Sequence, residues 1–225
     1  LVRTPRGVVL VDAGMDSSGA DIYRGLESMS ASPDEVSSIL LTHWHNDHAA
    51  GTRAIQETTT AQAYCHREDV PQLTRKTARF GLRGAISELI PEWGFFVLFK
   101  GLLGEATPRA ILNPQTVEDG ARINECFEVI ETPGHTPGHL SFFYKPERVL
   151  FAGDALAVVN DDVHFMARAV TPDVERARRS MRRCLELDAE VLCPGHRNPI
   201  THDVRRKCEQ MRKHIDSGGR WPILG

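Results

Sequence analysis

The chain has 225 residues, of which 41% are hydrophobic and 25% are charged, and its formal net charge is −3. This is the composition of an ordinary globular protein, and it excludes disordered, collagen-like and polybasic chains. A slightly acidic chain has no general affinity for nucleic acid, and no apolar run reaches the length of a transmembrane helix. We therefore expect a small-molecule substrate, with no nucleic acid and no membrane as partners.

The five cysteines are odd in number and widely spread, and no Cys-x-x-Cys pair occurs among them. A disulfide framework or a structural zinc knuckle is not expected from such spacing, so the cysteines are predicted to be reduced thiols in a cytoplasmic protein. The chain begins at Leu1 without a methionine, which leaves a preceding targeting segment open. Its length suits one large domain, 1–225.

Short β-branched runs alternate with helical patterns along the chain, which predicts an α/β fold. Strands are expected at Val8 to Asp12, Ser38 to Thr42, Ala61 to Cys65, Phe127 to Thr132, Leu140 to Tyr144, Val149 to Ala152 and Glu190 to Cys193. Helices are expected at Ala20 to Ser30, Thr52 to Glu57, Asp173 to Glu186 and Asp203 to Asp216. In the third helix, Ala177, Met181, Cys184 and Leu185 form an apolar stripe that should face the core.

An apolar segment at about 77–108 departs from this alternation, with Trp93, Phe96 and several further aromatic and aliphatic residues close together. Proline and glycine interrupt it too often for a membrane span. The alternatives are a helical hairpin packed on the core, a lid over an active site in which Trp93 and Phe96 contact substrate, and a homodimer contact.

Polar side chains follow four of the predicted strands directly. SILLTHWHNDH, FEVIETPGH, VLFAGD and EVLCPGH each pass from apolar residues through a turn into His or Asp. The carboxyl ends of buried strands are where α/β proteins assemble their sites, because rigid strands aim the side chains that follow them.

The densest of these segments is THWHNDH, which contains His43, His45, Asp47 and His48. Residues i and i+2 of an extended segment face the same way, so His43 and His45 can bind one ion. Asp47 and His48 come after a turn and should project elsewhere. The spacing therefore indicates two neighbouring metal sites, and nitrogen and oxygen ligands suit zinc best, with iron or manganese as alternatives.

His-x-His-x-Asp-His at 43–48, the later histidine of TPGHTPGH, the aspartate of FAGDA, the histidine of CPGH and the LVDAG segment resemble the metallo-β-lactamase superfamily. The resemblance implies a four-layer αβ/βα sandwich with two divalent metal ions at one edge of its sheets. It implies that His43, His45 and His135 bind the first metal, that Asp47, His48 and His196 bind the second, and that Asp154 bridges them. Asp47 would also act in catalysis, by orienting a metal-bound hydroxide or passing a proton to the leaving group.

The resemblance also implies supporting residues. Asp12 would lie beneath the ligands and orient them through hydrogen bonds, although a turn cap is the alternative for it. His139 is expected to make a structural hydrogen bond rather than bind metal. His164 and Arg168 follow Asp154 in a segment that is either a loop over the metals, where they would contact substrate, or a plain exposed loop.

The superfamily does not fix the substrate, and we expect a metal-dependent hydrolase of an ester, lactone or thioester, with at most weak β-lactamase side activity. The alternative is a mononuclear iron enzyme similar to the persulfide dioxygenases. Members normally begin with an edge strand before the segment that matches VVLVDAG here. None is recognisable in this sequence, so we expect either a missing preceding piece or an exposed edge on the first sheet.

Overall fold

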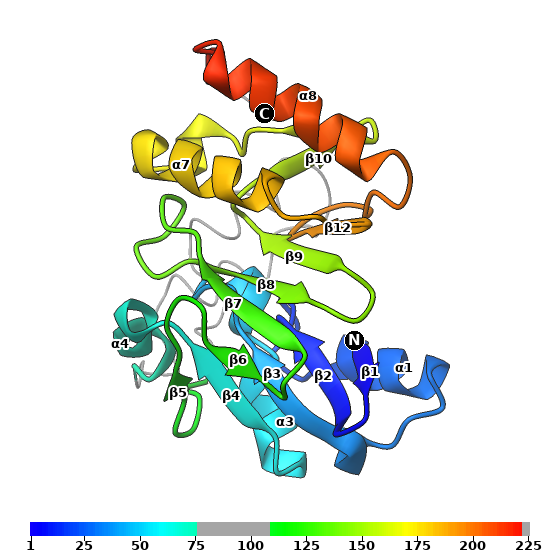
Figure 1. Cartoon of the computed structure of the whole chain (residues 1–225). Helices are drawn as coiled ribbons and strands as arrows, with labels where there is room; N and C mark the ends of the chain where they lie inside the picture. Colours follow the sequence, from blue (N-terminus) through cyan, green and yellow to red (C-terminus); the bar gives the residue numbers. More distant parts are fainter. Residues whose placement is uncertain (76–108, 222–225) are drawn as a thin grey trace. The chain divides into compact units, whose positions relative to one another are not determined.

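The computed structural model describes residues 1–75 and 109–221 (Figure 1). The predicted insert at 77–108, including Trp93 and Phe96, lies outside the described residues. The chain divides into two compact units: Leu1–Tyr64 with Val70–Gln115 form the first, and Cys65–Asp69 with Thr116–Gly225 form the second. That the whole chain is one domain stays a prediction. None of the described helices is both long and apolar enough to cross a bilayer.

The first unit is built on a mixed sheet with the strand order β1-β2-β3-β4-β5. Its strands are β1 (Val2–Thr4), β2 (Gly7–Val11), β3 (Val36–Leu40), β4 (Gln62–Cys65) and β5 (Gln115–Thr116). The last residue of β4 and the last residue of β5 are assigned to the second unit. Strands β2, β3 and β4 are parallel. The helices are α1 (Ala20–Ser28), α2 (Asn46–Ala49), α3 (Thr52–Thr58) and α4 (Val70–Leu73), with the short turn η1 (Pro33–Glu35) before β3.

The expectation that the first sheet lacks an N-terminal edge strand is wrong. Residues 2–4 form β1, which pairs antiparallel with β2 in the register Val2↔Val9 and Thr4↔Gly7. The two strands are joined by a turn of two residues, so residues 2–4 cover the edge of β2 that we expected to be open.

The second unit is built on a sheet with the strand order β12-β9-β8-β7-β6. Its strands are β6 (Arg122–Ile123), β7 (Phe127–Glu131), β8 (Leu140–Tyr144), β9 (Val149–Gly153) and β12 (Val191–Pro194). A separate hairpin consists of β10 (Ala157–Val159) and β11 (Asp162–His164). The helical elements are η2 (Arg67–Asp69), η3 (Arg168–Val170), α7 (Val174–Leu185) and α8 (Val204–Asp216).

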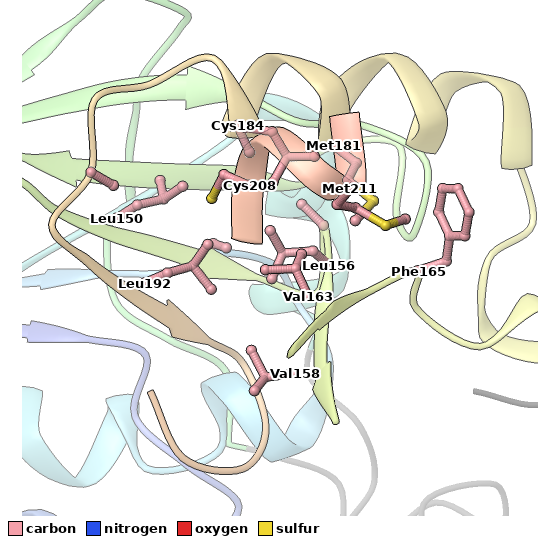
Figure 2. Packing of buried hydrophobic residues seen from close by; sticks show 14 of the residues in the cluster. Leu150, Leu156, Val158, Val163, Phe165, Met181, Cys184, Leu192, Cys208 and Met211 are labelled. Carbon is pink, nitrogen blue, oxygen red and sulfur yellow. The ribbon is translucent and has the colours of Figure 1, made fainter. Parts of the chain in front are cut away.

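Helices α7 and α8 cover one face of this second sheet and supply much of its core. Figure 2 shows Met181 and Cys184 of α7 and Cys208 of α8 gathered over Leu150 and Leu192 of the strands. The predicted stripe of α7 is confirmed, because all four of its apolar residues are at most 4% exposed. Each large apolar side chain buried in this way contributes about 1.5–3 kcal/mol to stability.

The segment after Asp154 is a β-hairpin and not the loop that the sequence suggested. Asn160 and Asp161 form its turn, and both have positive φ (50° and 66°), as a two-residue hairpin turn of the favoured hand requires. Val158 and Val163 of the two strands are 5% and 6% exposed and belong to the core of the second unit. The hairpin is therefore held by apolar packing as well as by its ladder.

Candidate metal centre

Five of the predicted site residues lie at one edge of the sheet in the first unit. Asp12 directly follows β2, and the segment from Thr42 to His48 follows β3. Because β2 and β3 are parallel, their carboxyl ends lie at the same edge, and Asp12 N–H donates to the carbonyl of Leu40 at 2.9 Å. The short helix α2 then begins after His45, which is still extended, and turns Asp47 and His48 away from the strand direction.

The imidazoles of His43 and His45 approach each other as the i, i+2 spacing predicts. The Nε2 atom of His43 lies 3.0 Å from Nδ1 of His45. His43 is completely buried and His48 is 2% exposed, whereas the side chain of Asp47 is 41% exposed. Two ring nitrogens this close can share either a proton or a cation.

Asp12 fixes the tautomer of His43, that is, which ring nitrogen carries the proton, through the hydroxyl of Thr42. The Thr42 backbone N–H and its hydroxyl both donate to the Asp12 carboxylate, at 2.7 Å and 2.8 Å. An ionised carboxylate only accepts hydrogen bonds, so the single hydroxyl proton is used there. The Thr42 oxygen must then accept from Nδ1 of His43, 3.0 Å away, and Nε2 is left as the nitrogen with a lone pair.

Asp12 also binds His48 directly. Its Oδ2 atom accepts from Nδ1 of His48 at 2.7 Å, so His48 likewise presents the lone pair of Nε2. That nitrogen lies 3.7 Å from Oδ2 of Asp47. One carboxylate at the sheet edge therefore sets the tautomer of two histidines, which is the usual role of a carboxylate behind metal-binding imidazoles.

The second unit brings His135, Asp154 and His196 to one edge of its own sheet. Strands β7 and β9 both run antiparallel to β8, and β12 is parallel to β9, so β7, β9 and β12 end at the same edge. The three residues follow those three strand ends.

The Asp154 carboxylate lies between two imidazoles. Its Oδ2 atom is 3.3 Å from Nε2 of His135 and 3.5 Å from Nε2 of His196. The side chains of Asp154 and His135 are 6% and 3% exposed, and that of His196 is half exposed. One carboxylate oxygen is thus placed to be shared by two positive centres, each beside one histidine.

His135 is oriented by a backbone carbonyl from a later segment. Its Nδ1 donates to the carbonyl of Val170 in η3 at 2.6 Å. With that nitrogen protonated, a neutral His135 directs the lone pair of Nε2 toward the Asp154 carboxylate. Two electron-rich atoms 3.3 Å apart repel unless a positive charge lies with them, so this pair of groups fits a bound cation.

His139 makes structural hydrogen bonds with both ring nitrogens. The Asp154 backbone N–H donates to its Nε2 at 2.9 Å, so Nδ1 carries the proton and donates to the hydroxyl of Thr132 at 2.7 Å. Thr132 in turn donates to Ser141 Oγ, which donates to the carbonyl of Ala152 at 3.0 Å. His139 therefore fixes the backbone of Asp154, and neither of its nitrogens is oriented as a ligand.

A close contact between the TPGH segment and α7 could not be read from the sequence. Gly134 has φ of +145°, and a Cβ placed on it would lie 2.5 Å from the Cα of Ala177. Asp173 N–H also donates to the carbonyl of Gly134 at 3.2 Å, and the Ser180 hydroxyl donates to that of Pro133 at 2.7 Å. Only glycine permits this approach, which presses the residue before His135 onto the helix.

Among the described residues, no cysteine belongs to the groups of side chains that could hold a metal ion. Burial raises the pKa of Cys184 and of Cys208 to about 11, and burial together with the charge of Asp69 raises that of Cys65 to about 12. These buried side chains are neutral thiols in the apolar interior, as structural cysteines usually are. The candidate donors of both units are then imidazole nitrogens and carboxylate oxygens, which suit zinc, iron or manganese.

The predicted substrate contacts are only partly described. His164 ends β11 and Arg168 begins η3, and both are exposed. Arg168 is two residues from the Val170 carbonyl that holds His135. Trp93 and Phe96 belong to the segment outside the described residues, so their proposed contact with substrate stays a prediction.

Two supporting residues were missed by the sequence analysis. Thr42 orients His43 through its hydroxyl, and Val170 orients His135 through its backbone carbonyl. A threonine directly before His-x-His was the readable signal for the first. The second had none, because any residue offers a carbonyl.

A fold with two sheets and polar ligands at the carboxyl ends of parallel strands is typical of metal-dependent hydrolases, and comparison with known proteins agrees. The family model of the metallo-beta-lactamase superfamily matches residues 1–196. The probable metallo-hydrolase YflN of Bacillus subtilis is 30% identical over 89% of this chain and 79% of its own length. The crystal structure of TTHA1623 in a di-iron-bound form is 25% identical, covers 92% of this chain and 90% of that one, and has a TM-score of 0.65.

A more distant relative is the atrochrysone carboxyl ACP thioesterase of Aspergillus fumigatus, 25% identical over 78% of this chain but only 42% of its own length. The chain belongs to the metallo-beta-lactamase superfamily and has its α/β fold. It is a metal-dependent hydrolase of that superfamily.

Proposed function

We propose that the protein is a dinuclear hydrolase of acyl compounds. In this proposal one ion is bound by His43, His45 and His135, the other is bound by Asp47, His48 and His196, and Asp154 lies between the two ions. That ligands of both units share each ion is what the resemblance to the superfamily implies. Support within one unit comes from Asp154, whose Oδ2 atom faces His135 at 3.3 Å and His196 at 3.5 Å. A carboxylate with an imidazole on either side is the arrangement that a bridge between two ions needs, and this observation carries the proposal.

A bound pair of divalent ions lowers the pKa of a water molecule toward about 7 and polarises a substrate carbonyl. The chain's own residues orient the groups around that reaction. Asp12 and Thr42 hold His43 and His48 in one tautomer, and His139 holds the backbone of Asp154. Asp47, whose carboxylate is partly exposed, would take a proton and deliver it to the leaving group.

For the substrate we propose an ester, lactone or thioester. The relative that is named as a carboxyl ACP thioesterase supports the acyl class. The sequence of residues 77–108 adds a reason to expect an apolar acyl part, because it carries Trp93, Phe96 and several further large apolar side chains. Zinc is the metal we propose first, and the di-iron-bound neighbour makes iron the metal to test beside it.

The decisive experiment is a hydrolysis screen on protein whose metal content has been measured. We expect about two ions per chain and hydrolysis of at least one acyl class that a chelator abolishes and added Zn²⁺ restores, with rates that increase with acyl chain length. Asp47→Asn should lose turnover and weaken binding of the ion that Asp47 helps to hold, and Asp21→Asn, which alters an exposed carboxylate of α1, should behave as the wild type. Full metal occupancy without hydrolysis of esters, lactones or thioesters would refute the proposal. Oxygen consumption with a persulfide and one iron per chain would instead favour the dioxygenase alternative.

A further inference from the structure

A second group of ionisable side chains lies beneath the segment that carries His135, and neither the family motif nor the proposed reaction uses it. The group belongs to Cys65–Asp69, the short stretch of the second unit that follows β4. His66 is 6% exposed and Asp69 is 1% exposed. A carboxylate this deeply buried is costly unless hydrogen bonds or an opposite charge compensate for its lost hydration.

His66 contacts the start of the His135 segment. Its Nδ1 accepts from the backbone N–H of Glu68 at 3.2 Å, so the ring proton is on Nε2. That nitrogen donates to Oε1 of Glu131 at 3.3 Å. Glu131 is the last residue of β7 and lies four positions before His135. The stretch Cys65–Asp69 is thus joined to β7, the strand that leads into the segment that carries His135.

Asp69 contacts the other end of the same segment. A Cβ placed on Gly138 would lie 2.8 Å from Cγ of Asp69 and closer still to its Oδ1, and it would lie 3.0 Å from Nδ1 of His66. Gly138 directly precedes His139, the residue that holds the backbone of Asp154. Glycine at this position lets the buried carboxylate lie directly against the main chain, where a side chain would push it away.

The two contacts enclose the residues from Glu131 to Gly138, and His135 lies between them. Helix α7 restrains the same residues through Ser180 and Ala177, by contacts described above. We propose that Asp69 is a positioning residue for the metal centre, which together with His66 fixes the TPGHTPGH segment and thereby sets the affinity of the ion that His135 binds. The inference rests on the proposed function, since it assigns Asp69 a role in that same site.

The test is metal affinity rather than turnover. Apo-protein is titrated with Zn²⁺ in competition with a chromophoric chelator, and folding of each variant is checked by circular dichroism. We expect Asp69→Ala to weaken binding of one of the two ions about 10–100-fold, the range found for residues that orient metal ligands. Asp69→Asn keeps the shape and one acceptor oxygen, so its loss should be smaller.

A double-mutant cycle with Gly138 shows whether the contact itself matters. Gly138→Ala should weaken the same ion as Asp69→Ala, because the new methyl group displaces the carboxylate. The double variant should be no worse than either single variant, since the two changes disrupt one contact. Asp161→Asn is the matched control, because it removes a carboxylate paired with the buried Lys207 elsewhere in the second unit and should leave both affinities unchanged.

Wild-type affinities for both ions in Asp69→Ala would overturn the inference, and so would losses that multiply in the double variant. If Asp69→Ala does not fold, Asp69→Asn and Gly138→Ala decide by the same comparison. Metal binding by the wild type distinguishes a failure of the proposed function from a failure of the role proposed for Asp69. If the wild type does not bind two ions, the proposed function fails. If it binds two ions and the variants bind them equally well, only the role of Asp69 fails.

Discussion

Replacement of Thr42 by valine tests the tautomer argument with almost no change of shape. The hydroxyl of Thr42 donates to Asp12 at 2.8 Å and accepts from Nδ1 of His43 at 3.0 Å. Valine removes both bonds. Asp12 keeps its bonds from the residue 42 backbone and from His48, so the loss is concentrated on His43.

The expected magnitude follows from the burial of His43, which is 0% exposed. A buried donor that loses its acceptor costs about 1–3 kcal/mol, and the ring can avoid part of that cost by moving its proton to Nε2. In that tautomer Nε2 has no lone pair for a metal. We therefore expect Zn²⁺ to bind about 10–100-fold more weakly, equivalent to about 1.4–2.8 kcal/mol.

Chelator competition on the apo-protein measures that affinity, and urea unfolding measures the stability of the apo-protein. Thr52→Val is the control, because Thr52 is also 0% exposed and its hydroxyl has no hydrogen-bond partner in the part of the chain that the structure describes. It should bind metal as the wild type does and unfold at the same or a higher urea concentration. Wild-type metal affinity in Thr42→Val would refute the reasoning.

Two further changes probe the second unit. Gly134→Ala combines an unfavourable φ of +145° with overlap on Ala177. We therefore expect the free energy of unfolding, measured in urea, to fall by about 1–3 kcal/mol and Zn²⁺ binding to weaken. An unchanged urea midpoint would contradict the observed approach of the segment to α7. The hydrogen bond from Lys207 lowers the pKa of Asp161, which also faces His202, below its usual 3.8. A carboxyl whose pKa is lowered by folding stabilises the protein above its unfolded pKa and loses that contribution as the pH falls through the folded value. The wild type should therefore be more stable than Asp161→Asn at pH 7, and urea midpoints should show this difference shrinking below about pH 4; a difference that grows in acid would contradict the sign.

The parts of the fold that were predicted correctly are those whose signal is local and repeated. Strands such as Phe127–Glu131 and helices such as Val174–Leu185 carry five or more patterned residues, enough to reveal their period. The ligand candidates were visible for the same reason, since each directly follows such a strand. β1 was missed because its three residues are too few to show alternation. The β10–β11 hairpin did offer a signal, because Asn-Asp between two valine-containing runs is typical of a tight turn.

The supporting contacts could not be predicted because they join residues far apart in the chain. Gly134 meets Ala177, His135 meets Val170, and Gly138 meets Asp69. A single sequence contains the glycines but not the neighbours that require them. The order of the motifs predicted which side chains gather at each sheet edge, whereas the orientation of each side chain depends on tertiary contacts that no local pattern encodes.

The hydrogen bonds of the three buried histidines among the proposed ligands have one consequence in common. His43, His48 and His135 all have Nδ1 bonded to an acceptor of the protein, which is a hydroxyl, a carboxylate and a carbonyl respectively. In each case the lone pair is on Nε2 before any ion arrives. Since a metal ion binds only the unprotonated nitrogen, no proton has to change position on these rings when it binds. The chain, rather than the metal, therefore selects the ligand atoms of the proposed centre, and we expect Asp12, Thr42 and Val170 to raise its affinity without being ligands.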